Sequence, residues 1–145
     1  MVSIENKESR ALWLVIALVI FLRFYELGTA SLWNDELATW LLLNTSSTLS
    51  ELFRHCALDN TPPLYQLISW ASFKLLGDSE GSLRVFSAIA GSLTLIASVW
   101  LANELKTFVQ RFSFCSMMSL SLVALTYSQE ARAYSLFLLF SVVGL

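Results

Sequence analysis

Three long apolar runs dominate this sequence, at residues 11–27, 82–102 and 112–127, and a fourth begins near residue 133. A helix needs about 20 mostly apolar residues to cross the hydrocarbon of a bilayer. The chain is 56% hydrophobic and only 14% charged, with a mean hydropathy of +0.64, which lies outside the usage of soluble globular domains. We therefore expect an all-α fold, a multi-pass transmembrane helical bundle. Because the fourth run stops at residue 145, we also expect the chain to be the N-terminal part of a longer protein.

The positive residues orient these spans. Lys7 and Arg10 precede the first span, and Lys106 and Arg111 separate the second from the third. Because positively charged segments favour the cytoplasmic side, we expect the N-terminus and the second connection to be cytoplasmic. The first loop, at residues 28–81, and the turn that follows the third span then share the extracytoplasmic face.

Helix-start signals in the first loop predict short helices at residues 35–43, 48–57 and 62–76. Asn34 is a candidate cap for the first, Thr48 with Glu51 has the spacing of a capping box for the second, and Thr61 with Pro62 begins the third. The third helix is too short to cross a bilayer and contains Gln66 and Lys74. We expect these helices to lie along the membrane interface.

The two cysteines and the single histidine give no metal or disulfide pattern. Cys56 lies in the first loop and Cys115 in the third apolar run, far apart and without the spacing of a zinc knuckle. We expect Cys56 to be accessible from outside, Cys115 to be buried, and neither to form a disulfide. His55 is interpreted as an exposed interfacial residue outside the site. The net charge of -2 and the lack of a basic cluster argue against a nucleic-acid partner.

Several segments, in order, resemble one enzyme family. They are "RFYELGTASLWNDELAT", "SELF", "TPPLYQLISW", "LLGDSEGSLRVFSAIAG" and "YSQEARAYSL", which cover the chain from Arg23 to Leu136. Together they resemble the N-terminal half of bacterial GT-C glycosyltransferases of family 39, the relatives of protein mannosyltransferases and aminoarabinose transferases. The resemblance implies a multi-pass enzyme of the bacterial plasma membrane that transfers a sugar from a polyprenyl-phosphate donor to an acceptor hydroxyl on a glycan, lipid or protein, on the extracytoplasmic face.

The same resemblance implies a role for two acids in the first loop. Asp35 would accept or orient the proton of the acceptor hydroxyl, and Glu36 is its weaker, more positional partner. A divalent cation held by acids of this loop would neutralise the departing phosphate, with its ligands unknown. The alternative is that both acids only stabilise the N-terminal turn of a helix.

Four further residues are candidates for substrate binding. Arg132, with its bidentate guanidinium, would hold the donor phosphate, with Glu130 beside it; the alternative is an interfacial ion pair. Tyr65 and Gln66 would line the substrate groove, although core packing is the simpler use of Tyr65. Arg23, near the outer end of the first span, is interpreted as structural, either anchored at the interface or bound to Glu26.

Two other functions are compatible with the sequence. A transporter or flippase for lipid-linked substrates would also place acids and an arginine in a membrane cavity, and it predicts internal repeats and spans broken by glycine or proline. Both prolines lie in the first loop, and no repeat is evident. The other alternative is a truncated membrane fragment that inserts without completing a site.

Overall fold

The computed structural model describes residues 2–144, and the side chains of residues 10–144. This part of the chain is helical and contains no strand, so the all-α prediction is confirmed. The elements in order are α1 (Val2–Phe24), α2 (Asn34–Thr45), α3 (Leu49–Asp59), α4 (Pro63–Leu76), α5 (Glu80–Ala102), α6 (Phe108–Leu120), α7 (Leu122–Ser128) and α8 (Tyr134–Val143).

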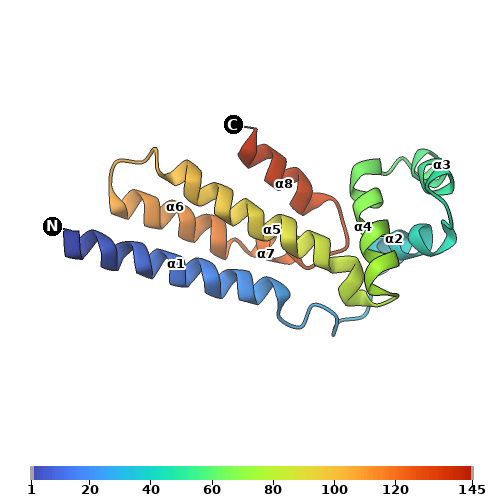
Figure 1. Ribbon diagram of the computed structural model, residues 1–145, viewed down its shortest axis with the longest axis horizontal. Coiled ribbons are helices and arrows are strands. Elements are labelled where there is room, and N and C mark those ends of the chain that lie inside the picture. The colour runs from blue at the N-terminus through green and yellow to red at the C-terminus, as the bar shows by residue number, and fades with distance from the viewer. Residues whose placement is uncertain (1, 145) are drawn as a thin grey trace.

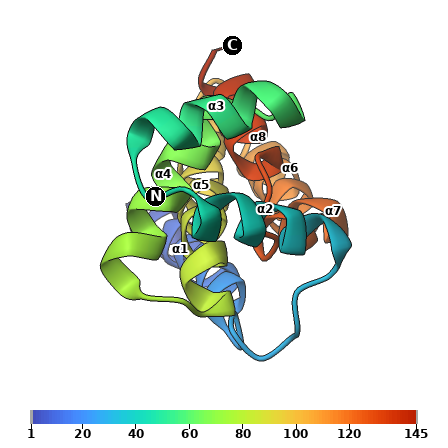
Figure 2. The ribbon, with the colours of Figure 1, turned by 90° about the vertical axis from the view of Figure 1, so that its right-hand side faces the viewer.

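Helix α5 is the centre of the arrangement. It packs against α1, α4, α6, α7 and α8. Figure 1 shows α1, α5 and α6 running side by side along the long axis, while α2, α3 and α4 gather at the end opposite the N-terminus. Figure 2 looks onto this end, where α2 and α3 lie across the ends of the long helices. The turn between α7 and α8 reaches the same end.

The three helices expected in the first loop are present, and each starts one residue away from its expected position. The capping box between Thr48 and Glu51 is confirmed, since each side chain bonds the other residue's backbone N–H. Asn34 does not cap α2; it is the first residue of the helix, and Trp33 precedes it without a side-chain hydrogen bond. Helix α4 begins at Pro63 because a residue before proline is disfavoured in the helical region, and Pro62 is therefore extended, with ψ of 115°.

The third predicted span is not one continuous helix. Helices α6 and α7 are separated at Ser121 and bent by 49°. Ser121 has an extended ψ of 116°, and its hydroxyl accepts a hydrogen bond from the Ala124 N–H, so it caps α7. By length and composition, α5 is the one described helix able to cross a membrane alone, and the α6–α7 pair could form a second, bent span. Helix α8 is apolar but short.

The long helices bury small polar side chains and expose large apolar ones. Ser87, Ser98 and Ser128 are at most 1% exposed. Their outward faces carry Leu14, Trp100, Met117 and Leu122 among others, each more than two-thirds exposed. Three buried hydroxyls of α5, those of Ser92, Thr94 and Ser98, donate to carbonyls one turn earlier in the same helix, at 2.7, 2.9 and 2.8 Å. Their hydrogen-bonding capacity is therefore met within the bundle.

Arg23 is structural, as expected, but its partner is not Glu26. Its side chain is 1% exposed, and its Nε donates to Ser128 Oγ at 3.1 Å while Nη1 donates to the carbonyl of Val19 at 3.2 Å. Gly91 lies directly beside this contact between α1, α5 and α7. The buried guanidinium thus joins the first helix to the last turn of α7.

The accessible position expected for Cys56 is wrong. Cys56 lies in α3 at 3% exposure and packs in the cluster formed with Leu52, Leu43 and Phe73. Helix α3 is amphipathic, and because Leu52 and Cys56 are four residues apart they lie on the same inner face of the helix. Cys115 is buried, as expected, and both thiols are free.

Gly91→Ala should destabilise the bundle. A Cβ at position 91 would lie 2.8 Å from Ser128 Cβ and closer still to its hydroxyl. Overpacking of this kind typically costs about 1–3 kcal/mol. Gly81→Ala in the same helix is the control, because its nearest neighbour would be at 3.8 Å. Unfolding in mixed micelles should show a loss for Gly91→Ala alone, and equal midpoints for both variants would contradict the close approach.

Candidate functional site

A buried ion pair between Glu36 and Arg84 lies at the centre of the end of the molecule where α2, α3 and α4 gather. Glu36 is 1% exposed and Arg84 is 4% exposed. The guanidinium is bidentate, with Nε donating to Oε1 at 2.8 Å and Nη2 to Oε2 at 2.6 Å. This geometry joins the first turn of α2 to the first turns of α5.

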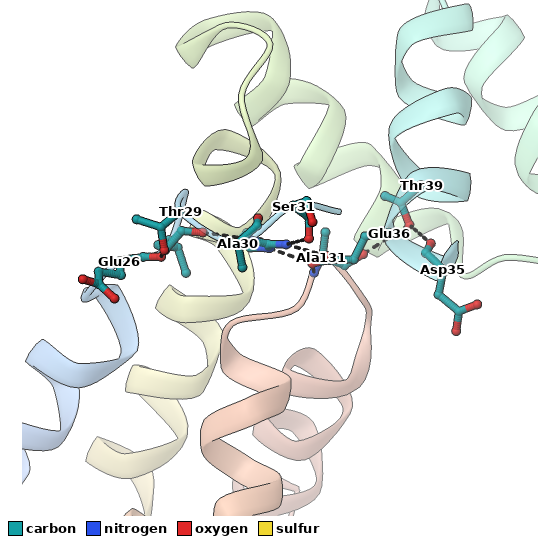
Figure 3. Close-up of polar contacts among 10 residues, drawn as sticks. Glu26, Thr29, Ala30, Ser31, Asp35, Glu36, Thr39 and Ala131 are labelled. Carbon is teal, nitrogen blue, oxygen red and sulfur yellow. Dashed lines mark hydrogen bonds and ion pairs between the residues drawn. The ribbon is translucent and has the colours of Figure 1, made fainter. Parts of the chain in front are cut away.

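Arg84 also fixes the connection between α1 and α2. Its Nη1 donates to the carbonyls of Leu27 and Ala30 at 3.0 and 2.8 Å, and Nη2 reaches the carbonyl of Ser31 at 3.3 Å. Figure 3 shows Ala30 and Ser31, two of the residues whose carbonyls accept these hydrogen bonds, close to Ala131 and Glu36. A buried charge is tolerated only when it is paired and hydrogen-bonded, and Arg84 meets both conditions.

The turn between α7 and α8 is held in place by hydrogen bonds to Glu36 and to residues of other elements. The Ala131 N–H donates to Glu36 Oε1 at 2.8 Å, and the Thr39 hydroxyl donates to the Ala131 carbonyl at 3.2 Å. Ser87 donates to the carbonyl of Arg132 at 3.2 Å. The Gln129 amide donates to carbonyls at the end of α1. The backbone of this turn is therefore fixed from three other elements.

Asp35 and Arg132 form a second ion pair, on the exposed side of α2 and the α7–α8 turn. Asp35 Oδ2 lies 3.1 Å from Arg132 Nη1, with side chains 50% and 32% exposed. Successive residues of a helix point about 100° apart, so Asp35 faces out while Glu36 faces in. Figure 3 shows the Asp35 carboxylate directed away from Glu36 and Ala131. The guanidinium also lies 5.5 Å from the Tyr134 ring centre.

The Asp35–Arg132 pair borders a cavity of about 770 Å³. This volume is within the range of roughly 300–1,000 Å³ that is typical of small-molecule sites. Its polar lining comes from α2, α3, the α3–α4 connection, α4, the α7–α8 turn and the start of α8. The polar residues are Asp35, Thr39, Thr45, His55, Asp59, Asn60, Thr61, Tyr65, Gln66, Arg132 and Tyr134.

Tyr65 and Gln66, the two residues expected in a substrate groove, both line this cavity. Tyr65 is 1% exposed, and its hydroxyl lies 3.1 Å from Ser87 Oγ. Burial raises the pKa of Tyr65 to about 12, so it remains protonated and acts as a hydrogen-bonding group only. Gln66 is 4% exposed, and its Oε1 has no hydrogen-bond partner.

Glu130 does not join Arg132 in the larger cavity. It lines a smaller one, of about 390 Å³, together with Glu26, Gln129 and Arg84. Its Oε2 is buried without a partner, and desolvation, followed by the nearby charge of Glu36, raises the pKa of the Glu130 carboxyl. The structure thus separates the two residues assigned to the donor phosphate.

Arg84 and His55 are among the residues of this site that the sequence motifs did not predict. Arg84 is the main support of the site, and the available signal was a charge within an otherwise apolar helix, which requires a buried partner. His55 was placed outside the site, yet it lines the larger cavity, and its Nδ1 lies 2.9 Å from Ser46 Oγ. The available signal was its position three residues after Leu52, because residues at that spacing share one side of a helix.

The divalent cation expected at the loop acids remains a prediction, and both acids have other partners in this structure. Glu36 is bound by Arg84 and Ala131, and Asp35 is bound by Arg132. Among the side chains of residues 10–144, no group of three or more His, Cys, Asp or Glu could hold a metal ion. No step is therefore assigned to a metal.

Comparison of the chain with models of protein families, with curated proteins and with solved structures finds no match. A functional assignment therefore depends on the sequence motifs and on the geometry described above.

Glu130→Gln should change how stability depends on pH. The folded-state pKa of Glu130 is raised, so the native chain retains a proton that the unfolded chain has lost, and stability falls as pH rises through the folded-state pKa. The neutral amide removes this fall and should make the variant more stable than wild type at pH 7. Unfolding measured from pH 4 to 8 tests this, with Glu104→Gln on an exposed turn as the control. Parallel curves for wild type and Glu130→Gln would contradict the buried, unpartnered carboxyl.

Proposed function

We propose that this chain is the N-terminal part of a membrane glycosyltransferase that transfers a sugar from a polyprenyl-phosphate donor to an acceptor hydroxyl at the extracytoplasmic face. The observation that carries the proposal is the pairing of Asp35 with Arg132 at 3.1 Å on the border of one cavity. These two residues are 97 positions apart in sequence. The motif resemblance implied a role in proton transfer for Asp35, and the bidentate guanidinium of Arg132 suggested a role in binding phosphate.

A membrane location is supported by the distribution of side chains. Large apolar groups cover the outward faces of α1, α5, α6 and α7, whereas serines and threonines lie inside. Helices that associate in lipid use small residues at their contacts and satisfy polar groups internally. A multi-pass arrangement would use α1, α5 and the bent α6–α7 pair, with α8 beginning a fourth crossing.

The orientation is supported by where the charged segments lie. The N-terminus and the α5–α6 turn, with Lys106, are at one end of the long helices, and α2–α4 are at the other (Figure 1). With the positive segments in the cytoplasm, the cavity faces outward.

The chemistry assigned to the cavity is a displacement at the anomeric carbon. Arg132, through its planar fork, binds the donor phosphate and stabilises the charge that develops on it. The acceptor oxygen attacks the anomeric carbon, the bond from that carbon to the phosphate oxygen breaks, and its electron pair leaves with the phosphate. Asp35 accepts the proton of the acceptor hydroxyl. A phosphate on Arg132 also competes with Asp35 for the guanidinium, so donor binding releases the carboxylate.

Glu36 takes no direct part in this scheme. Both of its oxygens are bound inside the protein, and it is 1% exposed. Its proposed role is to position the first turn of α2, which carries Asp35, against the turn that carries Arg132. Glu130 has no proposed contact with the donor phosphate.

The transporter alternative gains no support from the broken span. Discontinuous helices of transporters contribute their broken ends to the substrate site. The break at Ser121 lies between α6 and α7, and within the described part of the chain no residue of either helix lines the larger cavity. The break therefore gives no reason to prefer transport over transfer.

Cysteine labelling tests the orientation. Leu58→Cys, at a position 75% exposed on α3, should react with an impermeant maleimide on intact cells. Lys106→Cys, also exposed, should react only after the membrane is opened. The native thiols are buried and should contribute little background. Labelling of position 106 from outside would invert the proposed topology.

Asp35→Asn should lower turnover without unfolding the chain. The amide preserves shape but cannot accept a proton, and removal of a general base typically costs about a hundredfold to ten-thousandfold in rate. Stability should change by less than about 1 kcal/mol, because the pair with Arg132 is half-exposed. Sugar transfer by the correctly inserted enzyme that contains this chain is the measurement. Turnover near that of the wild type would remove Asp35 from the chemistry.

Arg132→Lys should weaken use of the donor more than use of the acceptor. Lysine keeps the charge but lacks the bidentate fork and the stacking on Tyr134. The KM for the polyprenyl-phosphate sugar should rise several-fold while the KM for the acceptor changes little. A matched effect on both substrates would argue for a structural role of Arg132.

A further inference from the structure

The larger cavity has a second polar wall, distinct from the Asp35–Arg132 pair. It is built at the junction of α3 and α4 by His55, Asp59, Asn60, Thr61 and Gln66. Neither a lysine nor an arginine belongs to this wall. The cavity therefore offers a cationic border on one side and a neutral to acidic, hydrogen-bonding wall on another.

Two side-chain oxygens of this wall are buried and unpartnered. They are Gln66 Oε1 and Thr61 Oγ1, and Gln66 itself is 4% exposed. Buried polar atoms in native proteins are almost always hydrogen-bonded, so each exception needs an explanation. The terminal amide torsion of glutamine is broad, which allows Gln66 to turn Oε1 toward a ligand at small cost.

The chemistry of these oxygens selects the kind of ligand. A glutamine carbonyl oxygen accepts hydrogen bonds, and a threonine hydroxyl both accepts and donates. The Asp59 carboxylate on the same wall disfavours an anion. A ligand with several neutral O–H groups meets these requirements, and the rings of Tyr134 and Phe137, which also line the cavity, suit its C–H faces. A pyranose or furanose ring has this combination.

We propose that Thr61 and Gln66 form a subsite that binds the ring hydroxyls of a sugar while Arg132 binds phosphate. Its location next to a donor phosphate rests on the proposed transferase function; the recognition of hydroxyl groups by this wall does not. The hydroxyls belong either to the sugar of the donor or to an acceptor glycan, and both present the same chemistry to Gln66 and Thr61.

Binding measured in lipid nanodiscs tests the subsite, without glycoside detergents, which would compete for it. One arm uses a panel of methyl glycosides of common hexoses and pentoses, which lack lipid and phosphate. The second arm compares bare polyprenyl phosphate with polyprenyl-phosphate hexoses and pentoses. The variants are Gln66→Leu and Thr61→Val. Ser69→Ala is the matched control, because Ser69 is also buried and unpartnered on α4 but does not line the cavity.

The wild-type chain should bind at least one glycoside, and each subsite variant should weaken that binding about fivefold or more, the usual effect of one lost hydrogen bond. Ser69→Ala should bind as wild type. If the subsite holds the donor sugar, the preference for glycosylated over bare lipid should also disappear in Gln66→Leu. If it holds an acceptor glycan, that preference should remain.

The proposal is overturned if the wild-type chain binds no glycoside and has no preference for glycosylated lipid, or if the subsite variants and Ser69→Ala behave alike. Failure of the transferase proposal has a different signature. Bare polyprenyl phosphate would then bind weakly, or Arg132→Lys would leave its affinity unchanged, while the glycoside arm still responds to Gln66 and Thr61.

Discussion

The buried ion pair between Glu36 and Arg84 is the interaction on which the rest of this end of the molecule depends. Through two residues it connects α2, α5, the α1–α2 connection and the α7–α8 turn. Two charges removed from water repay their desolvation only when the geometry is good and the remaining hydrogen-bonding groups are satisfied. Both conditions hold, since the pair is bidentate and the other guanidinium hydrogens reach carbonyls. Such a pair favours one arrangement of four segments that come from distant parts of the sequence.

Two adjacent residues have different roles, since Glu36 stabilises the fold around the site and Asp35 is proposed to take part in the reaction. Helix geometry points Glu36 inward to Arg84 and Asp35 outward to the cavity. One helical turn therefore carries both the structural carboxylate and the proposed catalytic one. The turn that carries Arg132 is fixed through its backbone by Glu36, Thr39 and Ser87, which leaves the guanidinium accessible. An exposed ion pair contributes little to stability by itself. The proposed role of the Asp35–Arg132 pair is functional, because a phosphate can displace Asp35 from Arg132 at small cost.

The sequence predicted the local features of the fold better than the long-range ones. The helical class, the three loop helices and the Thr48–Glu51 capping box were predictable because their signals lie within a few residues of each other. The partners of Arg23 and Arg84 were not, because a charge in an apolar helix shows that a partner is needed without showing which one. The break at Ser121 has no glycine or proline to announce it, and the burial of Cys56 depends on packing against α2 and α4. Asp35 and Arg132 were proposed separately from motifs, and only the structure brings them within 3.1 Å.

A double-mutant cycle on Glu36 and Arg84 tests most directly whether this pair holds the site together. Either Glu36→Gln or Arg84→Gln leaves an uncompensated buried charge, and each should lower the free energy of unfolding by about 3–5 kcal/mol. The double variant should recover about 2–3 kcal/mol of the summed loss. The exposed pair, compared through Asp35→Asn and Arg132→Gln, should couple by only about 0.2–1 kcal/mol. Additive losses at Glu36 and Arg84, within about 0.5 kcal/mol, would contradict the central place given to this ion pair.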